Sequence, residues 1–316
     1  MNETQSVVDN PKDADHCLLI DVSNLAYRSL FAYDLATADG SPSGHVYGSV
    51  KLLLSTLKND LTPGKWCLIF CYDGIRAKED RLKILPTYKE GRTKKFNPLP
   101  DVRDVLRSVP GLHVESDVRE GDDAIAWMTE VLTKKTGADI TILTGDKDMW
   151  ALTRFDGVKI LSPNKKRFIT QADIEKEYHV KDPGKIHLFK SFFRDASDNI
   201  EGVKFLKKAS LAPYINMEDV KTPEDVYKKL VDSEWNGFSV KTRFKIEDAK
   251  GIVIKNFQVV CPMMDCFGKE SVHKTSISEE AKKSLYSKLM KFECRDLAVK
   301  TDYLFGGEQY VANNEP

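Results

Sequence analysis

The sequence predicts an α/β fold with a mostly parallel central sheet and helices on both faces. Short apolar runs rich in strand-forming residues alternate with longer segments whose apolar residues recur at helical spacing. Such alternation is typical of parallel strands joined by right-handed helical crossovers. With 316 residues, 41% of them hydrophobic, the chain is long enough for one large body and a smaller appendage.

The expected elements follow a polar leader at residues 1–16. Cys17 to Val22 has the pattern of a fully buried strand, and a helix is expected from Ser23 to Leu35 with Ser23 as its cap. A second helix is expected from Val46 to Leu57. The strands and helices expected after it are Trp66–Asp73, His113–Ser116, Asp122–Lys135 (helix), Ile140–Leu143, Val158–Leu161, Thr170–Glu177 (helix), Lys185–Arg194 (helix) and Ser278–Phe292 (helix).

Two segments depart from this alternation. Residues 76–98 carry few apolar side chains, and between Arg76 and Lys95 eight basic residues face three acidic ones. From residue 204 to 316 the apolar pattern loosens, which predicts a second, mainly helical lobe. The formal net charge of the whole chain is zero, so a nucleic-acid partner is indicated locally rather than globally.

The sequence also bears on location. No stretch approaches the roughly 20 apolar residues of a membrane helix, and the acidic N-terminal residues do not resemble a signal peptide. We therefore expect the protein in the cytoplasm, or in the host cytoplasm if a bacteriophage encodes it.

Aspartates occur where the predicted strands end. Asp21 closes the first strand, Asp73 closes the second, and Asp146 and Asp148 follow the strand that ends at Leu143. The carboxyl ends of parallel strands meet at one edge of a sheet, so these acids should converge there. Further acids, which lie at the start of a predicted helix or just after one, are Glu120, Asp122, Asp123, Asp195 and Asp198.

Each of these acids has an ordinary structural explanation when taken alone. An aspartate after a strand is commonly a turn or cap residue, and an acid in a first helical turn gains about 0.3–1 kcal/mol from the helix dipole. Taken together they need a cation, because two carboxylates about 5 Å apart repel by roughly 3 kcal/mol at an effective dielectric near 20. Oxygen ligands without clustered histidine or cysteine select Mg²⁺ or Mn²⁺, and a two-ion site favours in-line displacement at phosphorus.

Six motifs resemble, in order and spacing, those of the flap endonuclease and 5′ to 3′ exonuclease family. They span roughly residues 17 to 203 and are most similar to the small bacteriophage members, including phage ribonuclease H. The motifs are CLLIDVSNLAYR, LIFCYD, LPTYKEGR, REGDDAIA, TGDKDM and DASDNIEGV.

The resemblance implies a PIN-like 5′ nuclease fold: a catalytic domain at residues 17–203, with a basic helical arch at 76–98 above two groups of metal-binding carboxylates. Two Mg²⁺ ions are implied, with Mn²⁺ as a substitute. The first group would contain Asp21, Asp73, Glu120 and Asp122, with Asp123 adjoining. The second would contain Asp146, Asp148, Asp195 and Asp198, with Asp146 near both groups. Lys89 and Arg92 match the basic pair that contacts the scissile phosphate.

The implied activity is cleavage near 5′ ends, flaps or nicks in DNA during replication or repair, leaving a 5′-phosphate and a 3′-hydroxyl. RNA:DNA hybrids, a single-strand-binding protein and a sliding clamp are further partners that the resemblance allows, for a monomeric enzyme. Tyr88 is compatible with stacking on a base or with a place in the core. The other residues expected to contact nucleic acid are Arg76, Arg81, Lys83, Lys94, Lys95, Lys204, Lys207 and Lys208.

The chain departs from the family pattern after Ile200. Glu201 stands where the family typically has proline, and residues 204–208 lack the glycine turn of a helix-hairpin-helix, which argues against a potassium site. A catalytically silent nucleic-acid binder with the same fold remains the alternative, although no expected carboxylate is missing. A phosphatase of the haloacid dehalogenase type would need a second aspartate where Ser23 stands.

Overall fold

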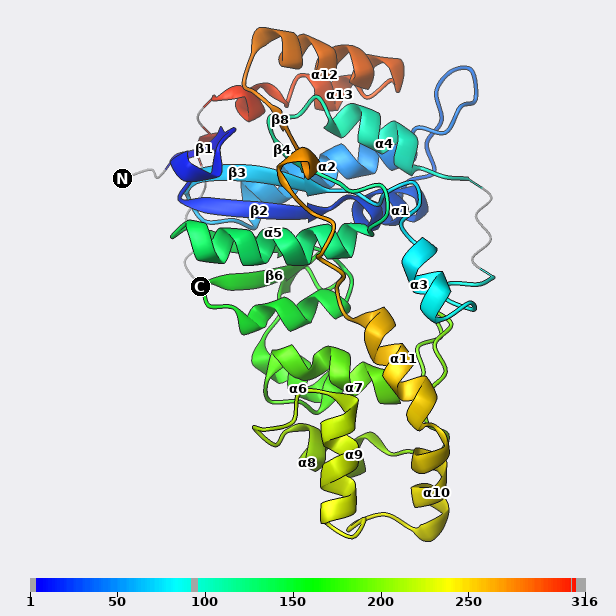
Figure 1. The fold of residues 1–316 in the computed structure, drawn as a ribbon. Coiled ribbons are helices and arrows are strands. Elements are labelled where there is room, and N and C mark those ends of the chain that lie inside the picture. Colours follow the sequence, from blue (N-terminus) through cyan, green and yellow to red (C-terminus); the bar gives the residue numbers. More distant parts are fainter. Residues whose placement is uncertain (1–3, 92–95, 308, 311–316) are drawn as a thin grey trace.

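A computed structural model describes residues 4–91, 96–307 and 309–310, which form a nine-stranded, mostly parallel sheet between two layers of helices (Figure 1). The strands lie in the order β7-β6-β5-β2-β3-β1-β9, and β4 pairs with β3 and β8. Three pairs are antiparallel: β1 with β9, β4 with β8 and β6 with β7. The strands are β1 (Thr4–Val8), β2 (His16–Asp21), β3 (Gly64–Cys71), β4 (Gly111–Val114), β5 (Asp139–Leu143), β6 (Val158–Ser162), β7 (Arg167–Phe168), β8 (Val272–Thr275) and β9 (Gln309–Tyr310).

Successive residues of β2 face opposite layers, as expected for a strand buried on both sides. Cys17 and Leu19 pack in one core, and Leu18 and Ile20 pack in the other. The helices of the first core include α5 (Gly121–Lys135), α6 (Gln171–Tyr178) and α7 (Ile186–Phe192). Those of the second are α1 (Val22–Ala32), α2 (Gly44–Asn59), α4 (Leu99–Leu106), α12 (Glu279–Lys291) and α13 (Arg295–Ala298). The predicted α/β architecture is confirmed.

Shorter elements complete the fold. Helix α3 (Glu79–Ile84) lies within the basic segment. Turns of 3-10 helix are η1 (Pro11–Asp13), η2 (Asp148–Arg154), η3 (Pro183–Lys185), η4 (Lys269–Ser271) and η5 (Asp302–Phe305). None of the helices in the described part of the chain has both the length and the apolar composition needed to span a bilayer.

The predicted helix starts were correct for two helices and wrong for one. Thr170 and Ser278 are the N-caps of α6 and α12, each through its hydroxyl. Helix α1, in contrast, is capped by Asp21, whose carboxylate accepts a hydrogen bond from the Asn24 amide, and the helix ends at Ala32. The hydroxyl of Ser23 donates to Asp73 instead.

The sequence had suggested a polar leader at residues 1–16, separate from the fold, but part of this range belongs to the sheet. Within this range Thr4–Val8 forms β1, which pairs parallel with β3 from Gly64 to Cys67. The side chains of Gln5 and Val7 are buried. This strand was missed because TQSVV has too few apolar residues for a strand signal of its own.

The region from 204 to 316 is also not one helical lobe. Four helices extend the molecule below the sheet: α8 (Lys208–Ile215), α9 (Pro223–Asp232), α10 (Val240–Asp248) and α11 (Lys250–Val260) (Figure 1). The chain then returns to the sheet, where β8 pairs with β4 and Leu285 of α12 joins the core that contains Leu18. The predicted boundary was wrong because sequence pattern does not show that residues 272–275 pair with a strand near residue 112.

Candidate active site

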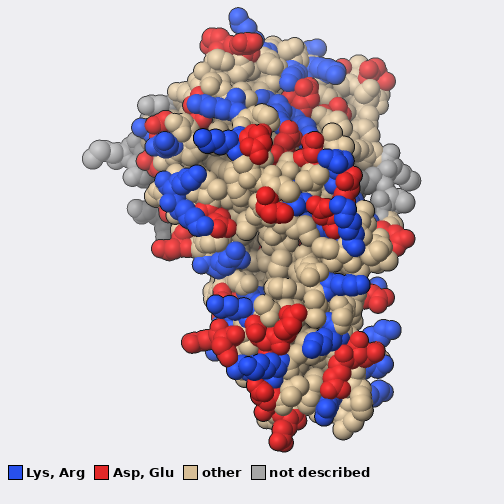
Figure 2. All heavy atoms as spheres, in the orientation of Figure 1, with Lys and Arg blue, Asp and Glu red and all other residues tan. Residues whose placement is uncertain are grey.

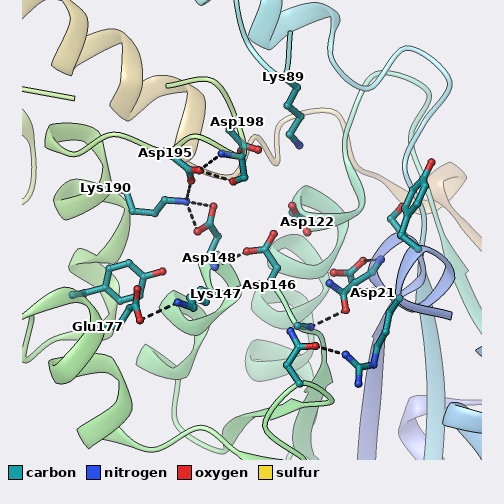
Figure 3. Close-up of a pocket in the computed structure, with 18 of the residues that line it drawn as sticks. Asp21, Lys89, Asp122, Asp146, Lys147, Asp148, Glu177, Lys190, Asp195 and Asp198 are labelled. Carbon is teal, nitrogen blue, oxygen red and sulfur yellow. Dashed lines mark hydrogen bonds and ion pairs between the residues drawn. The ribbon is translucent and has the colours of Figure 1, made fainter. Parts of the chain in front are cut away.

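Seven of the predicted aspartates line one open pocket of about 960 Å³. The pocket lies beyond the carboxyl ends of β2, β3 and β5, where Figure 3 shows the labelled carboxylates turned toward a shared space. The seven are Asp21, Asp73, Asp122, Asp146, Asp148, Asp195 and Asp198. The sequence-based expectation that these acids converge is therefore confirmed.

Hydrogen bonds from neighbouring loops hold the acids that follow β2 and β3. Asp21 accepts from the Asn24 amide at 2.9 Å and from the Thr144 hydroxyl at 2.7 Å. Asp73 accepts from the Ser23 hydroxyl and from the Gly121 amide, both at 2.7 Å. These carboxylates are oriented by the fold before any ligand binds.

In the structure the first group consists of Asp21, Asp73, Asp122 and Asp146, because Asp146 lies near Asp21 and Asp122, although the resemblance placed it in the second group. Burial and mutual repulsion shift the ionisation of this group. Burial, with Asp73 close by, raises the pKa of Asp21 to about 6. Burial, with Asp148 beside it, raises the pKa of Asp146 to about 7. The pKa of Asp122 is also raised well above its usual value, by burial and by Asp146 and Asp21. The first group is thus an accumulation of negative charge that a bound cation would relieve.

A second group lies beside the first and contains a cation of its own. Oxygens of Asp148, Asp195 and Asp198 lie within 4.8 Å of one another. The ammonium group of Lys190, from α7, contacts the Asp148 carboxylate and lies 2.8 Å from Asp195 Oδ2 (Figure 3). Burial alone would raise the pKa of Asp195, but the nearby Lys190 ammonium group holds this pKa at about 2.

Lys89 links the basic segment to the first group. It lines the pocket, and its ammonium group lies 2.7 Å from Glu120 Oε1. Glu120 lies behind the pocket wall, where its other oxygen accepts from the Tyr88 hydroxyl at 2.9 Å. Burial alone would raise the pKa of Glu120, but Lys89 and Arg81 hold it below its usual value.

The expectation that Asp123 joins the metal ligands is wrong. Its two oxygens accept a bidentate pair of hydrogen bonds from Arg81, at 2.8 and 2.7 Å. The same carboxylate accepts from the backbone amides of Glu120 and Met263. With the side chain fully buried and its acceptor sites used in this way, Asp123 is a structural anchor.

Two residues expected to contact nucleic acid are buried instead. Arg81 is 4% exposed and pairs with Asp123, and Tyr88 is 4% exposed and donates to Glu120, which excludes stacking on a base in this arrangement. Their place in a charged segment concealed this, because burial depended on partners distant in sequence. Arg76 and Lys83 are exposed and pair with Glu79 and Asp80. Arg92, Lys94 and Lys95 lie outside the described residues.

Of the three lysines expected to bind the duplex beyond residue 203, Lys208 lines the pocket. Lys204, Lys207 and Lys208 are exposed, and the Lys208 ammonium group lies 5.5 Å from the centre of the Phe189 ring. Over the face drawn in Figure 2, acidic and basic side chains are interspersed and neither sign forms a continuous area.

Sequence reasoning missed the residues that organise the carboxylates. Lys190 was treated as part of a helix, although a lysine five residues before Asp195 was a usable signal. Ser23 was expected only as a helix cap and Thr144 only as part of the TGDKDM motif, yet their hydroxyls donate to Asp73 and Asp21. Such roles depend on contacts between segments, which single-sequence periodicity does not contain.

The donor set fits divalent cations. Carboxylate oxygens predominate, and among the described residues the one group of acids, histidines or cysteines whose ligand atoms lie close enough to share an ion consists of three aspartates. Hard oxygen donors of this kind suit Mg²⁺ and Mn²⁺. The raised pKa values of Asp21 and Asp146 show that the first group, too, would gain from a bound cation.

Comparisons with known proteins agree with this arrangement. The sequence profile of the family described as 5′-3′ exonuclease, N-terminal resolvase-like domain, matches residues 16–179. The chain is 30% identical over 191 residues to a 5′-3′ exonuclease of Aquifex aeolicus, which covers 59% of this chain and 64% of that protein. It is also 30% identical over 229 residues to a thermostable DNA polymerase I of Thermus thermophilus, covering 67% of this chain and 26% of the polymerase. The chain thus spans less than two thirds of either relative.

Solved structures share the fold. The 5′-exonuclease of bacteriophage T5, in a structure with bound zinc ions, superposes with a TM-score of 0.58 at 16% identity, covering 92% of this chain and 97% of that chain. The catalytic core of Rad2, in a complex with DNA substrate, gives a TM-score of 0.52 at 14% identity, covering 94% and 95%. At these identities the similarity concerns the arrangement of the chain.

Proposed function

Because the chain belongs to the 5′-3′ exonuclease family, we propose that it is a structure-selective 5′ nuclease that hydrolyses phosphodiesters with two divalent ions, Mg²⁺ under physiological conditions. Its substrates would be DNA with 5′ ends, flaps or nicks, and RNA:DNA hybrids at RNA-primed ends. Replication or repair would be its setting, in the cytoplasm.

One observation supports this proposal most: seven aspartates line a single pocket, and one wall of that pocket carries a lysine. Crowding of this kind disfavours the ionised carboxylates, because it raises the pKa values of Asp21 and Asp146 to about 6 and 7. A purely structural role would not require such an arrangement.

The residues divide into two sets by position. Asp21, Asp73, Asp122 and Asp146 would hold one ion, and Asp148, Asp195 and Asp198 the other, with Asp146 close to both. Ions bound there would supply the Lewis acidity that in-line hydrolysis at phosphorus requires. The carboxylates themselves fix the positions of the ions, because backbone amides and hydroxyls hold Asp21 and Asp73 in place.

Lys89 would bind the scissile phosphate. Glu120, 2.7 Å away, holds its ammonium group at the pocket wall. A lysine ammonium group donates strong, charge-assisted hydrogen bonds to phosphate oxygens. Arg92 would be the second residue to bind this phosphate, a proposal that is based on the sequence motif alone. Lys204, Lys207 and Lys208 would contact the duplex backbone beyond the pocket, because they are exposed.

The test is a time course on a 5′-flap duplex labelled at each end, with Mg²⁺ or with EDTA. Wild type should release short products from the 5′ side only with Mg²⁺. Asp146→Asn should bind the duplex and leave it uncut, because the substitution removes a carboxylate that faces both groups.

The control is Asp173→Asn, which alters a carboxylate outside the pocket that pairs with Lys165 and Arg167. It should cleave like wild type. A flap that wild-type protein binds but leaves intact with Mg²⁺ or Mn²⁺ would overturn the proposal and support the silent nucleic-acid binder.

A further inference from the structure

The loop that carries Asp195 and Asp198 is closed on itself. The amide of Asp195 donates to the Ile200 carbonyl at 3.0 Å, and the amide of Ile200 donates back to Asp195 at 2.9 Å. Asn199 turns the chain with a φ of 55°, and a Cβ atom on Gly202 would lie 2.2 Å from the Arg194 nitrogen. The loop is therefore a compact unit whose orientation depends on what it rests against.

The loop rests on two segments that are distant in sequence. Ile200 packs with Leu85 and Tyr88 of the basic segment and with Val259 near the end of α11. The Lys89 amide donates to the Asp198 carbonyl, and the Asn199 amide group donates to the Thr87 carbonyl, both at 2.9 Å. Helix α11, from the region beyond the motifs, thus supports the loop from below.

Asn256 of α11 makes the polar part of this support. Its side chain is fully buried, and its amide nitrogen donates to the Glu201 carbonyl at 2.7 Å and to the Ser191 carbonyl at 3.0 Å. Two N–H donors meet two carbonyl acceptors, which fixes the orientation of the amide. Ser191 follows Lys190 on α7, so one side chain joins the loop to the helix that bears its counter-cation.

Toward the described residues, the Asn256 side chain makes hydrogen bonds through its NH₂ group only. Asn256 Oδ1 is buried without a hydrogen-bond partner in the described part of the chain, a cost that an apolar side chain would not carry. The same helix end also contacts the basic segment, because Arg81 Nε donates to the Val259 carbonyl at 2.9 Å. Figure 1 shows α11 beside α3, the helix that carries Arg81.

We propose that Asn256 is a positioning residue for the second carboxylate group, holding the loop of Asp195 and Asp198 against α7 so that these acids and Asp148 share one ion. This inference rests on the proposed function, since it concerns how the pocket holds its second ion. It extends the catalytic unit beyond residue 203, to a helix outside the matched family segment at 16–179.

The experiment measures Mn²⁺ binding to the full chain without DNA, by calorimetry and by electron paramagnetic resonance of free Mn²⁺. Asn256→Leu removes both donors at similar volume and should weaken the weaker of two binding events about tenfold or more, the usual effect of losing a group that orients a metal ligand. The tighter event should be unchanged. Asn256→Ala serves the same purpose if Asn256→Leu does not fold.

The matched control is Val253→Ala, one turn earlier on α11 and also fully buried. It should lower the melting temperature without changing Mn²⁺ binding. Equal Mn²⁺ affinities in wild type and both Asn256 variants, or an equal loss in Val253→Ala, would overturn the inference and leave the proposed function intact. Wild-type protein that binds no Mn²⁺ would overturn the proposed function, and the inference with it.

Discussion

The two carboxylate groups differ in what balances their charge. In the first, buried Asp21 and half-buried Asp122 and Asp146 lie near one another, and the pKa of each is raised. In the second, Lys190 contacts Asp148 and Asp195, and the pKa of Asp195 is lowered to about 2. The two adjacent groups of acids therefore have opposite electrostatic environments.

The difference indicates how each group should respond to a cation. An ion entering the first group relieves repulsion among carboxylates held by the sheet, so binding there should be tight. An ion entering the second group has to compete with the Lys190 ammonium, and it binds to a loop rather than to strand ends. The first site should therefore fill at lower ion concentration than the second.

The largest expected effect is on cleavage. Asp122→Asn should lower kcat by about 10³-fold or more, because an ion in the first group would contribute several kcal/mol to the transition state. Asp195→Asn should cost less, about 10- to 100-fold, since Asp148 and Asp198 remain. Single-turnover rates with saturating enzyme would measure both, and equal losses would remove the distinction between the groups.

Replacing Lys190, the cation of the second group, tests whether the two groups differ in how their charge is balanced, with the free energy of unfolding as the measure. Lys190→Met leaves two partly buried carboxylates unpaired and should reduce the free energy of unfolding of the metal-free protein by about 3 kcal/mol. Mn²⁺ should restore part of this loss by taking the place of the ammonium group. Urea unfolding with EDTA and with Mn²⁺ gives both values, and a variant as stable as wild type in EDTA would contradict the role of Lys190.

The first group should make metal-free stability depend on pH. Folded-state pKa values of about 6 for Asp21 and 7 for Asp146 exceed the unfolded value near 3.8, so the folded state binds more protons between those limits. The stabilisation from this group is fully present below about pH 4 and is lost as pH rises toward 7, which should lower the free energy of unfolding by roughly 3 kcal/mol or more.

Comparison with Asp146→Asn isolates this contribution from other titrating groups. In EDTA the variant should be more stable than wild type at pH 8 and similar to it at pH 4. Mg²⁺ should reverse the order at pH 8, because wild type gains more from the ion. An unchanged difference across this pH range would show that Asp146 is not under electrostatic strain.

The smallest expected effect concerns the lysines outside the pocket. Lys207→Ala should weaken binding to duplex DNA a few-fold at low salt and reduce the slope of log K against log salt by about 0.9, the value for one phosphate contact. Cleavage of bound substrate should be unaffected, in contrast with the pocket variants. Lys12→Ala, an exposed lysine near the N-terminus, is a matched control that should leave the slope unchanged.

The strand-end acids were predictable because the rule behind them is local. A parallel strand and the residue after it can be found from apolar runs, and the carboxyl ends of neighbouring strands share an edge, which placed Asp21, Asp73 and Asp146 together. Helix caps such as Thr170 were predictable for the same reason, since the cap and the amide it accepts from lie within one turn.

The unpredicted features depend on contacts between distant segments. Arg81 belongs to a charged segment, but Asp123 and the Val259 carbonyl surround it. Asn256 has no local motif, and its partners lie 55 and 65 residues earlier in the chain. Burial of a polar side chain is decided by whether a partner completes its hydrogen bonds, and that information is absent from local periodicity.

The return of the chain to the sheet after α11 has a consequence for shortened forms of this protein. Strand β8 covers the edge of β4 from Gly111 to Val114, and α12 covers apolar residues of the second core. A protein ended at residue 203, where the motifs end, would expose that edge and that surface. Unprotected strand edges template pairing with other chains, so such a fragment should aggregate even though it retains all seven pocket aspartates.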